Sequence, residues 1–509
     1  MSLSGGYVSD IGYTAGFYPE TAPAHIAFAA LCGANSPGLA WRPRRILELG
    51  FGQGFGLALL AASNPDVAFE GYDFNAEHVA HARTLIDSAR VANLSVKNAS
   101  FEDAVGEGDR DVDVVILHGV LSWIDATSQQ AVVSILRRRL RPNGLVYVSY
   151  NCMPGWAPLT PIRRLILQVK HRNPGRSAHQ IALGLDLLGK LRRSKAGYLS
   201  VNPIAADHVS VMLDMDRAYL AHEYLTDRTE VPDFSDIAGI LAPAGLTYIA
   251  SATLLDNFEE YAIPESVRPI LAEIGDPILQ QVVRDFAANK KFRRDLYARG
   301  ASTFAPGERR QLLSELRFTL CIPRARLTLQ FLGPVGEITL RPEFHAVVAD
   351  LLARRAATFD ELLALPPFGG NRVDLLVDCL ALLIHSGQVL PVSSEPCSDI
   401  SPAQRFNRMV AECARSGRFY GHLASPVAKT GVFADELALL TLAEWFNNKL
   451  DDELTSARAV LSLLTAVGKR PHREDRPIED DNEATALVTQ HMRLVVSERF
   501  PVWRALGVF

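Results

Sequence analysis

A glycine-rich turn after the apolar stretch at 44–50 is the first feature of the sequence that could bind a ligand. Its glycines fall at every second residue: Gly50, Gly52, Gly54 and Gly56. The dinucleotide fingerprint G-x-G-x-x-G is therefore not matched. Glu48 stands two residues before the turn, where a carboxylate would compete with a bound pyrophosphate. These residues favour a ligand that shares the adenosine of NAD but carries a cation in place of pyrophosphate, as S-adenosylmethionine does.

Two further segments could hold the adenosine. Asp73 follows the turn by about 20 residues, the spacing at which a carboxylate accepts hydrogen bonds from a ribose. The alternative is that Asp73 is only a charge at a helix N-terminus. Phe74 and Phe101 could enclose the adenine ring, although packing in the hydrophobic core explains each of them nearly as well.

The acceptor side of the site is expected at the next strand ends. His118 and Trp123 lie in "HGVLSWID", after the stretch that predicts the fourth strand, and Tyr150 and Asn151 lie in "SYNCMPGW", after the fifth. S-adenosylmethionine carries a methyl group that can be transferred, and we predict that these side chains face it. The alternatives are that His118 and Trp123 only support the structure and that Tyr150 and Asn151 lie in an ordinary strand-to-loop corner.

The elements that must position these residues alternate between strand and helix from 44 to 151. The expected strands are 44–50, 67–73, 94–101, 112–119 and 145–151. The expected helices are 56–63, 76–92 with Asn75 as N-cap, and 127–140 ended by "RPNG". This order predicts an α/β fold with a Rossmann-like parallel sheet, whose ligands bind at the carboxyl ends of the strands.

The chain of 509 residues is long enough for several domains. We expect five parts: a cofactor-binding methyltransferase core at 1–156, a helical insertion at 157–230, a middle region at 231–324, a winged-helix-like module at 325–396 and a helical C-terminal domain at 397–509. The middle region is expected to complete the sheet with two more strands, one of them near 317–322. The winged-helix-like module carries Arg372 against Asp374 and Asp378 on its third helix, which favours packing or protein binding over DNA reading.

Composition excludes several classes of protein. With 48% hydrophobic and 21% charged residues the chain can form a globular core. Its net charge of −5 lacks the excess of positive charge that is typical of proteins that bind nucleic acid. The six cysteines form no C-x-x-C pair, so neither a metal site nor a disulfide framework is expected. The N-terminus lacks the pattern of a signal peptide, and no apolar run is long enough to span a membrane. We expect a cytoplasmic protein.

Several motifs together resemble those of a known family. They are "LELGFGQG", "HGVLSW", "SYNCMPGW", "YLAHEYL" (219–225), "GLTYIASATL" (245–254), "NKKFRRDL" (289–296) and "LASPVAKTGV" (423–432), with a leader that comprises Tyr7, Tyr13, Phe17, Thr21 and Pro23. The chain resembles bacterial class I methyltransferases with a methyltransferase regulatory domain, a family that includes protein-lysine methyltransferases of bacterial outer-membrane proteins. The resemblance covers nearly the whole chain.

The resemblance implies S-adenosylmethionine as cofactor and adds Tyr13 to the residues expected to bind it. Ser100 stands where the family often has an aspartate for the adenine amine, so its backbone or nearby Asp103 would serve instead. Phe51 replaces a common cysteine, which should be harmless.

Three functions compete at this point. Protein-lysine methylation is favoured because the extra domains could grip a macromolecule. A small-molecule methyltransferase comes second, since those domains could equally form a lid or a homodimer interface, and a non-catalytic cofactor-binding module comes third. A lysine acceptor must lose a proton, and the candidate bases are His118, Tyr150 and, if the helical insertion folds over the site, His222 and Glu223. The acceptor itself, the atom methylated and the number of methyl groups stay open.

Overall fold

The computed structural model describes residues 8, 10–227, 231–300, 304, 307–392, 397–473 and 476–509. Tyr7 of the expected leader lies outside the described residues, as do residues 474 and 475 of the acidic segment 474–483. Among the described residues, no helix combines the length and the apolar character needed to cross a membrane.

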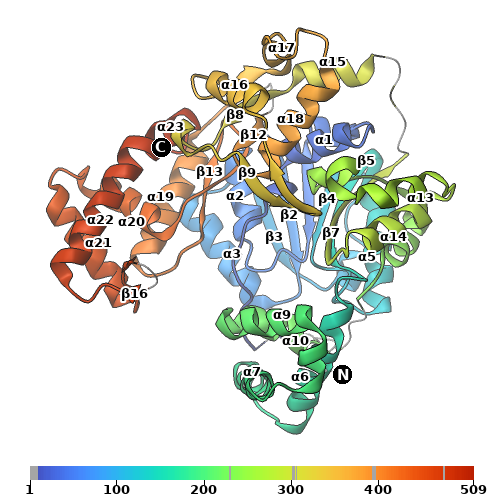
Figure 1. Cartoon of the computed structure of the whole chain (residues 1–509), viewed down its shortest axis with the longest axis horizontal. Helices are drawn as coiled ribbons and strands as arrows, with labels where there is room; N and C mark the ends of the chain where they lie inside the picture. Colours follow the sequence, from blue (N-terminus) through green and yellow to red (C-terminus); the bar gives the residue numbers. More distant parts are fainter. Residues whose placement is uncertain are drawn as a thin grey trace.

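A seven-stranded sheet forms the centre of the molecule (Figure 1), with the order β3-β2-β1-β4-β5-β7-β6. Its strands are β1 (Arg45–Leu49), β2 (Ala68–Asp73), β3 (Leu94–Asn98), β4 (Val112–His118), β5 (Leu140–Asn151), β6 (Leu246–Ser251) and β7 (Phe292–Arg299). The first five strands pair in parallel, and β7 is antiparallel to both β5 and β6. The predicted Rossmann-like α/β fold is confirmed. All five strands expected between 44 and 151 are present.

The helices of this part follow the sequence closely. They are α1 (Pro23–Cys32), α2 (Phe55–Ser63), α3 (Ala76–Ala89), α4 (Phe101–Ala104) and α5 (Ala126–Arg139). The side chain of Asn75 accepts a hydrogen bond from the Glu77 amide at 2.9 Å and so caps α3 as predicted. Three boundaries differ by three residues or more. The strand β3 ends at Asn98 so that Phe101 begins α4, α3 ends at Ala89 rather than at 92, and β5 begins at Leu140 so that "RPNG" lies inside this strand.

The prediction for the last two strands of the sheet is half wrong. The strand near 317–322 is β8 (Arg317–Leu320), which belongs to a separate three-stranded sheet, and the strand between β5 and β6 is β7. The sequence of β7 hides its burial because it contains Arg293 and Asp295, which are 5% and 0% exposed. Arg293 forms ion pairs with Asp295 at 2.9 Å and with Asp285 at 2.5 Å, and this pairing makes the charges tolerable in the interior.

A group of helices follows β5 and lies at the foot of the sheet (Figure 1). It comprises α6 (Thr160–Arg172), α7 (Ser177–Arg193), α8 (Gly197–Val201), α9 (Pro203–Asp214) and α10 (Arg217–Leu225). These helices have a hydrophobic core of their own, which includes Trp156, Ile166, Ile181 and Leu220. The region expected to be helical is therefore helical up to residue 225.

The middle of the chain completes the sheet and adds small helices beside it. These are α11 (Phe234–Leu241), α12 (Glu259–Ala262), α13 (Arg268–Ala272), α14 (Pro277–Ala287) and α15 (Glu308–Glu315). The next part contains the antiparallel sheet β11-β8-β12, a hairpin and three helices. Its elements are β9 (Gln330–Gly333), β10 (Gly336–Thr339), α16 (Pro342–Leu352), β11 (Ala357–Thr358), α17 (Phe359–Leu363), α18 (Val373–His385) and β12 (Val389–Val392).

The third helix of that part, α18, is engaged in contacts within the chain. Asp374 pairs with Arg309 at 2.7 Å, and Asp378 accepts a hydrogen bond from the Tyr261 hydroxyl at 3.0 Å. Both acidic residues thus attach α18 to neighbouring segments. The winged-helix description of this part stays a prediction.

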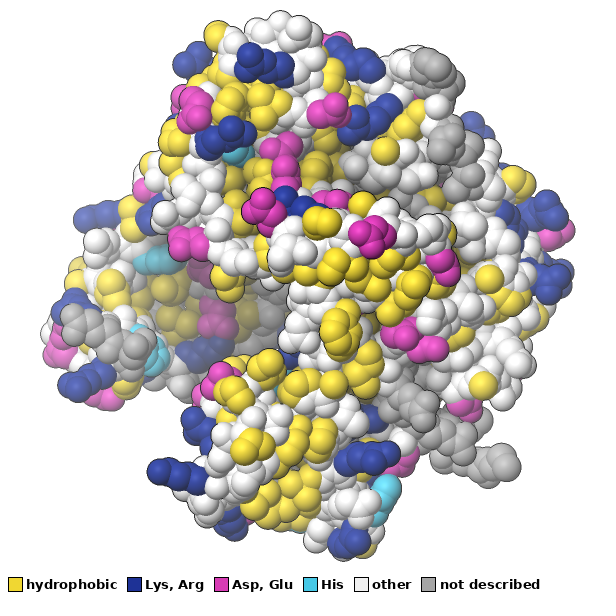
Figure 2. Space-filling view, turned by 45° about the vertical axis from the view of Figure 1, so that its right-hand side comes forward, with side chains coloured by type: hydrophobic (Ala, Val, Ile, Leu, Met, Phe, Trp, Pro, Cys, Tyr) yellow, Lys and Arg dark blue, Asp and Glu magenta, His cyan; other side chains and the backbone are white. Residues whose placement is uncertain are grey.

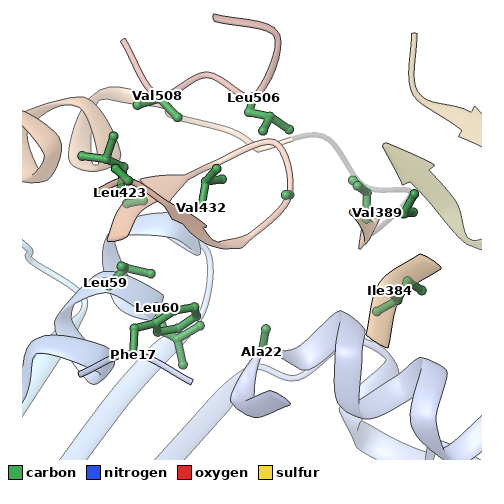
Figure 3. Packing of buried hydrophobic residues seen from close by; sticks show 14 of the residues in the cluster. Phe17, Ala22, Leu59, Leu60, Ile384, Val389, Leu423, Val432, Leu506 and Val508 are labelled. Carbon is green, nitrogen blue, oxygen red and sulfur yellow. The ribbon is translucent and has the colours of Figure 1, made fainter. Parts of the chain in front are cut away.

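The C-terminal part is mainly helical and packs against α2. Its elements are α19 (Ser401–Arg415), β13 (His422–Ser425), β14 (Thr430–Phe433), α20 (Glu436–Asn448), α21 (Glu453–Ala466), β15 (His472–Arg473), β16 (Arg476–Pro477), α22 (Asp481–Leu494) and α23 (Phe500–Ala505). Figure 3 shows Leu423 and Val432 of the β13–β14 hairpin above Leu59 and Leu60 of α2. Since one hydrophobic cluster runs through both parts, the C-terminal part supports the helix that follows the glycine turn.

The surface is hollowed between two lobes (Figure 2). The lower lobe is formed by the helical insertion, and the lobe on the left is formed by the C-terminal part. Charged and hydrophobic side chains both lie in the hollow, and hydrophobic side chains also gather on the lower lobe.

Candidate active site

A cavity of about 1060 Å³ lies at the carboxyl ends of the parallel strands. All but one of the residues predicted for the cofactor and acceptor line it: Tyr13, Glu48, Gly50, Gly52, Gly54, Asp73, Phe74, Ser100, Phe101, His118, Trp123 and Asn151. The exception is Tyr150. The structure thus brings together side chains from β1, β2, β4, β5 and the N-terminal segment.

The glycine turn is shaped so that only glycine fits at its first and third positions. Gly50, Gly52 and Gly54 all have positive φ, of 75°, 59° and 74°. A Cβ atom on Gly50 would lie 2.8 Å from Val120 Cγ2, and one on Gly54 would lie 2.5 Å from Ala82 Cβ. A Cβ on Gly52 would meet nothing closer than Tyr13 Cδ1 at 4.0 Å. The space over Gly52 is therefore open to a ligand, while its neighbours fix the turn.

Two carboxylates flank this turn. Asp73 is 5% exposed, and its Oδ2 accepts a hydrogen bond from the Gly52 amide at 2.9 Å while Oδ1 accepts one from the Asn75 amide at 2.9 Å. Glu48 lines the cavity, and burial together with the nearby Asp73 carboxylate raises its pKa to about 8. Glu48 is half-buried, and a carboxylate in such a place with a raised pKa is short of positive charge. The site therefore suits a ligand that brings a cation to Glu48, as the sequence predicted.

The expected adenine side is formed by Phe74, Ser100 and Phe101, which all line the cavity. Ser100 caps α4, since its hydroxyl accepts a hydrogen bond from the Asp103 amide at 3.2 Å and donates one to the Asp103 carboxylate at 2.8 Å. Asp103 is bound in this capping box and is not among the residues that line the cavity. The adenine amine would therefore meet the backbone of Ser100 rather than the side chain of Asp103, because Ser100 lines the cavity.

His118 lies at the end of β4 among aromatic and hydroxyl groups. Its ring stacks on Tyr18 with the centroids 3.6 Å apart. Its Nδ1 lies 3.1 Å from the hydroxyls of Tyr147 and Ser149. Burial and the charge of Arg294 lower the pKa of His118 to about 3. The imidazole is thus neutral near pH 7, and Nδ1 can either donate to or accept from these hydroxyls.

A carboxylate from the helical insertion reaches the same strand ends. Glu223 of α10 is 9% exposed, lines the cavity, and accepts a hydrogen bond from Asn151 Nδ2 at 3.2 Å. Burial raises the pKa of Glu223 to about 7, although the nearby charges of Arg163 and Lys291 act in the opposite direction. The insertion therefore folds over the site, as the role of Glu223 as a candidate base requires.

His222, the other candidate from this helix, has a different environment. Its Nε2 donates a hydrogen bond to the carbonyl oxygen of Ile11 at 2.9 Å, and its ring lies edge-on to Tyr13. Burial lowers the pKa of His222 to about 4. His222 thus connects α10 to the N-terminal segment over the glycine turn.

The prediction that Tyr150 faces the acceptor is wrong. Tyr150 is fully buried within the hydrophobic cluster that includes Phe234 and Tyr297, and its hydroxyl donates to Asp295 Oδ2 at 2.5 Å. Successive side chains in a strand point to opposite faces. Since Asn151 points to the cavity, its neighbour Tyr150 points to the other face.

Several residues that line the cavity were not predicted from the sequence. They are Tyr18, Tyr219, Lys291, Phe292 and Arg294, among others. The last three lie in or beside β7, whose charged sequence conceals a strand. A pairing of Asn151 with Phe292 in the β5–β7 ladder brings them to the site. The motif "NKKFRRDL" was the one signal that pointed to this segment.

Comparison with known proteins agrees with this geometry. A methyltransferase domain model matches residues 46–144, and a model described as a predicted methyltransferase regulatory domain matches residues 216–299. The protein sll1526 of Synechocystis is 30% identical over 516 residues, with all of both chains covered. The chain is a class I methyltransferase with a methyltransferase regulatory domain.

Solved structures show the same fold for the whole chain. PKMT2 from Rickettsia typhi in complex with AdoHcy superimposes with a TM-score of 0.71 and 18% identity, covering 97% of this methyltransferase and 100% of PKMT2. A second relative by sequence is the Rickettsia prowazekii protein RP789, which is 26% identical over 56% of this chain and 51% of its own.

S-adenosylmethionine is the cofactor of this methyltransferase. The residues present fit it, because the open space over Gly52 and the raised pKa of Glu48 suit a ligand with a cationic end. Among the described residues, no group of three or more His, Cys, Asp or Glu side chains could hold a metal ion.

Proposed function

We propose that the protein is an S-adenosylmethionine-dependent protein-lysine N-methyltransferase. The observation that carries the proposal is the buried carboxylate of Glu223 on the acceptor side of the cavity. Although Arg163 and Lys291 lower the pKa of this carboxyl group, burial still raises it to about 7, so a further cation would favour the ionised form. A lysine ammonium would supply such a cation, which a neutral small molecule would not, and it would gain from the aromatic rings of Tyr18 and Tyr219, which line the same cavity.

Glu223 is also suited to the proton transfer that lysine methylation requires. An acceptor ammonium has a pKa near 10.4 and must lose its proton before its nitrogen can attack a methyl group. The cofactor supplies an activated methyl on a sulfonium. The protein has to align the nitrogen with it and exclude water. With its pKa raised to about 7, the Glu223 carboxylate is ionised in part at neutral pH and accepts protons more readily than an ordinary glutamate.

Other residues then take roles around this carboxylate. Asn151 orients Glu223 through its hydrogen bond at 3.2 Å. The neutral His118 and Trp123 form walls that shape the acceptor side. Asp73 holds the ribose, Phe74 and Phe101 enclose the adenine, and Tyr13 covers the cofactor.

The division of the chain is part of the proposal. The core at 1–156 binds the cofactor, the insertion at 157–230 and the middle region supply the acceptor side, and the parts at 325–396 and 397–509 contact a protein substrate. The reassigned strand β8 moves the start of the fourth part to about residue 317. We place the protein in the cytoplasm, where its six free cysteines stay reduced.

The proposal can be tested with methyl-labelled cofactor and an extract of the source cells. Incubation with the purified protein should label proteins, and mass spectrometry of their digests should place the label on lysine side chains. AdoHcy added in excess serves as the control, because it should abolish specific labelling. Label confined to the small-molecule fraction would support the alternative of a metabolite methyltransferase, and label on protein side chains other than lysine would contradict the proposed acceptor.

A further inference from the structure

Lys291 is a lysine of the protein itself that lines the cofactor cavity. Its carbonyl oxygen accepts a hydrogen bond from the Cys152 amide at 3.0 Å, and the following residue, Phe292, pairs with Asn151 in the sheet. The backbone of Lys291 is therefore fixed beside the strand end that carries Asn151. This is the same side of the cavity as Glu223.

The side chain of Lys291 is exposed, but its amine lies next to a histidine rather than in open solvent. Its Nζ lies 3.4 Å from Nδ1 of His208, and burial lowers the pKa of His208 to about 4, so this imidazole is neutral. Burial lowers the pKa of Lys291 as well, although the charge of Glu223 opposes the shift. A larger fraction of Lys291 is thus in the neutral, nucleophilic form at a given pH.

The adjacent lysine provides a natural contrast. Lys290 Nζ lies 2.6 Å from both carboxylate oxygens of Asp256, with both side chains largely buried. It is not among the residues that line the cavity. Two neighbouring lysines therefore differ in that one is held in an ion pair and the other is next to the cofactor site.

We propose that the protein methylates its own Lys291. The inference rests on the proposed lysine N-methyltransferase activity and adds a modification site to it. The Nζ lone pair forms a bond to the methyl carbon of S-adenosylmethionine, and the carbon–sulfur bond breaks with its electron pair left on sulfur, which yields AdoHcy. The surplus proton on nitrogen passes to the Glu223 carboxylate or to water, so no other reactant is needed.

The position of Lys291 favours a reaction within one molecule. A lysine head group sits on a flexible four-carbon stem, so Nζ can turn from His208 toward the interior of the cavity. A tethered amine has a high effective concentration, which replaces the affinity that a separate acceptor needs. The rate for each molecule should therefore not depend on protein concentration.

Mass spectrometry of the purified protein provides the direct test. The protein is analysed as purified and after incubation with S-adenosylmethionine, using a protease that does not cut at lysine and fragmentation that separates residues 290 and 291. We expect methyl groups on Lys291 and none on Lys290, at a rate for each molecule that is unchanged over about a hundredfold dilution. Lys291→Arg should reduce this label to background, and the matched variant Lys290→Arg should retain it.

A second measurement needs no turnover. Acylation of the protein by a limiting amine reagent at neutral pH should modify Lys291 faster than Lys290, and AdoHcy should slow the reaction at Lys291 alone. Failure of AdoHcy to protect Lys291 would overturn the proposal, because the amine would then lie too far from the methyl position.

The two proposals can fail separately. If lysines of other proteins acquire label while Lys291 does not, self-methylation is refuted and the proposed function stands. If no lysine of any protein acquires label, both are refuted.

Discussion

Replacement of Glu223 by glutamine tests the acceptor site most directly. The variant keeps the shape and the contact with Asn151 but removes the charge and the proton acceptor. In the wild type, kcat/KM for a lysine acceptor should rise about tenfold per pH unit up to about pH 7 and then level off, because this quantity reports the ionisation of the free enzyme. Glu223 is protonated below that pH and ionised above it, so activity is lost as the pH falls.

The variant should behave differently because only a lysine that is already neutral can react. Its kcat/KM should lie about 10²–10³-fold below the wild type at pH 7 and should continue to rise about tenfold per unit toward the pKa of the acceptor near 10.4. Stopped assays with labelled cofactor between about pH 6 and 9 would measure both profiles, and calorimetry should show unchanged cofactor affinity. Glu102→Gln is a matched control. Glu102 lines the same cavity, but it lies on the expected adenine side and accepts a hydrogen bond from the Ser128 hydroxyl at 2.7 Å. Identical pH profiles for the wild type and Glu223→Gln would refute the proposed role.

Three further changes test other parts of the site. Asp73→Ala should weaken cofactor binding by about 1.5–3 kcal/mol in calorimetry, because charge-assisted hydrogen bonds to the ribose are lost; unchanged affinity would contradict the ribose assignment. In the wild type, cofactor affinity should increase with pH between about pH 6 and 7.5, since a cation favours the ionised form of Glu48 with its pKa of about 8, and Glu48→Gln should remove this dependence. Tyr150→Phe should lower the free energy of unfolding by about 1–3 kcal/mol, because Asp295 loses a buried hydrogen-bond donor. Its turnover should persist. A large loss of turnover with unchanged stability would instead indicate that Tyr150 acts in catalysis.

The residues predicted to hold the cofactor line one cavity, and most of the signals that pointed to them are local. The spacing from the glycine turn to Asp73 follows from one strand-helix-strand unit, and hydrophobic patterning reveals the two strand ends at which the turn and Asp73 lie. Asn75 caps its helix through atoms two residues apart. Tyr13 is an exception, because it reaches the cavity from the N-terminal segment and its ring contacts His222.

The side of the cavity proposed for the acceptor depends on contacts that local patterns do not encode. Glu223 reaches Asn151 across 72 residues of chain, and its helix gives no indication by itself of the surface on which it packs. Lys291 precedes β7 and Arg294 lies within it, and the charges of this strand are paired in the interior, so hydrophobicity fails to identify it. The error at Tyr150 has another origin: strand alternation allows only one of two neighbours to face the cavity, and the sequence alone did not show which.

The position of the regulatory domain argues that it takes part in the reaction. Residues 216–299 match the regulatory model, yet Tyr219, Glu223 and Lys291 from this segment line the same cavity as the glycine turn. Its strand β7 pairs with β5 from Leu145 to Asn151, so the segment is built into the catalytic sheet. This segment therefore forms the side of the cavity proposed for the acceptor, while the glycine turn is held by Asp73. Substitutions of Tyr219 or Glu223 should accordingly change turnover of the acceptor far more than affinity for the cofactor.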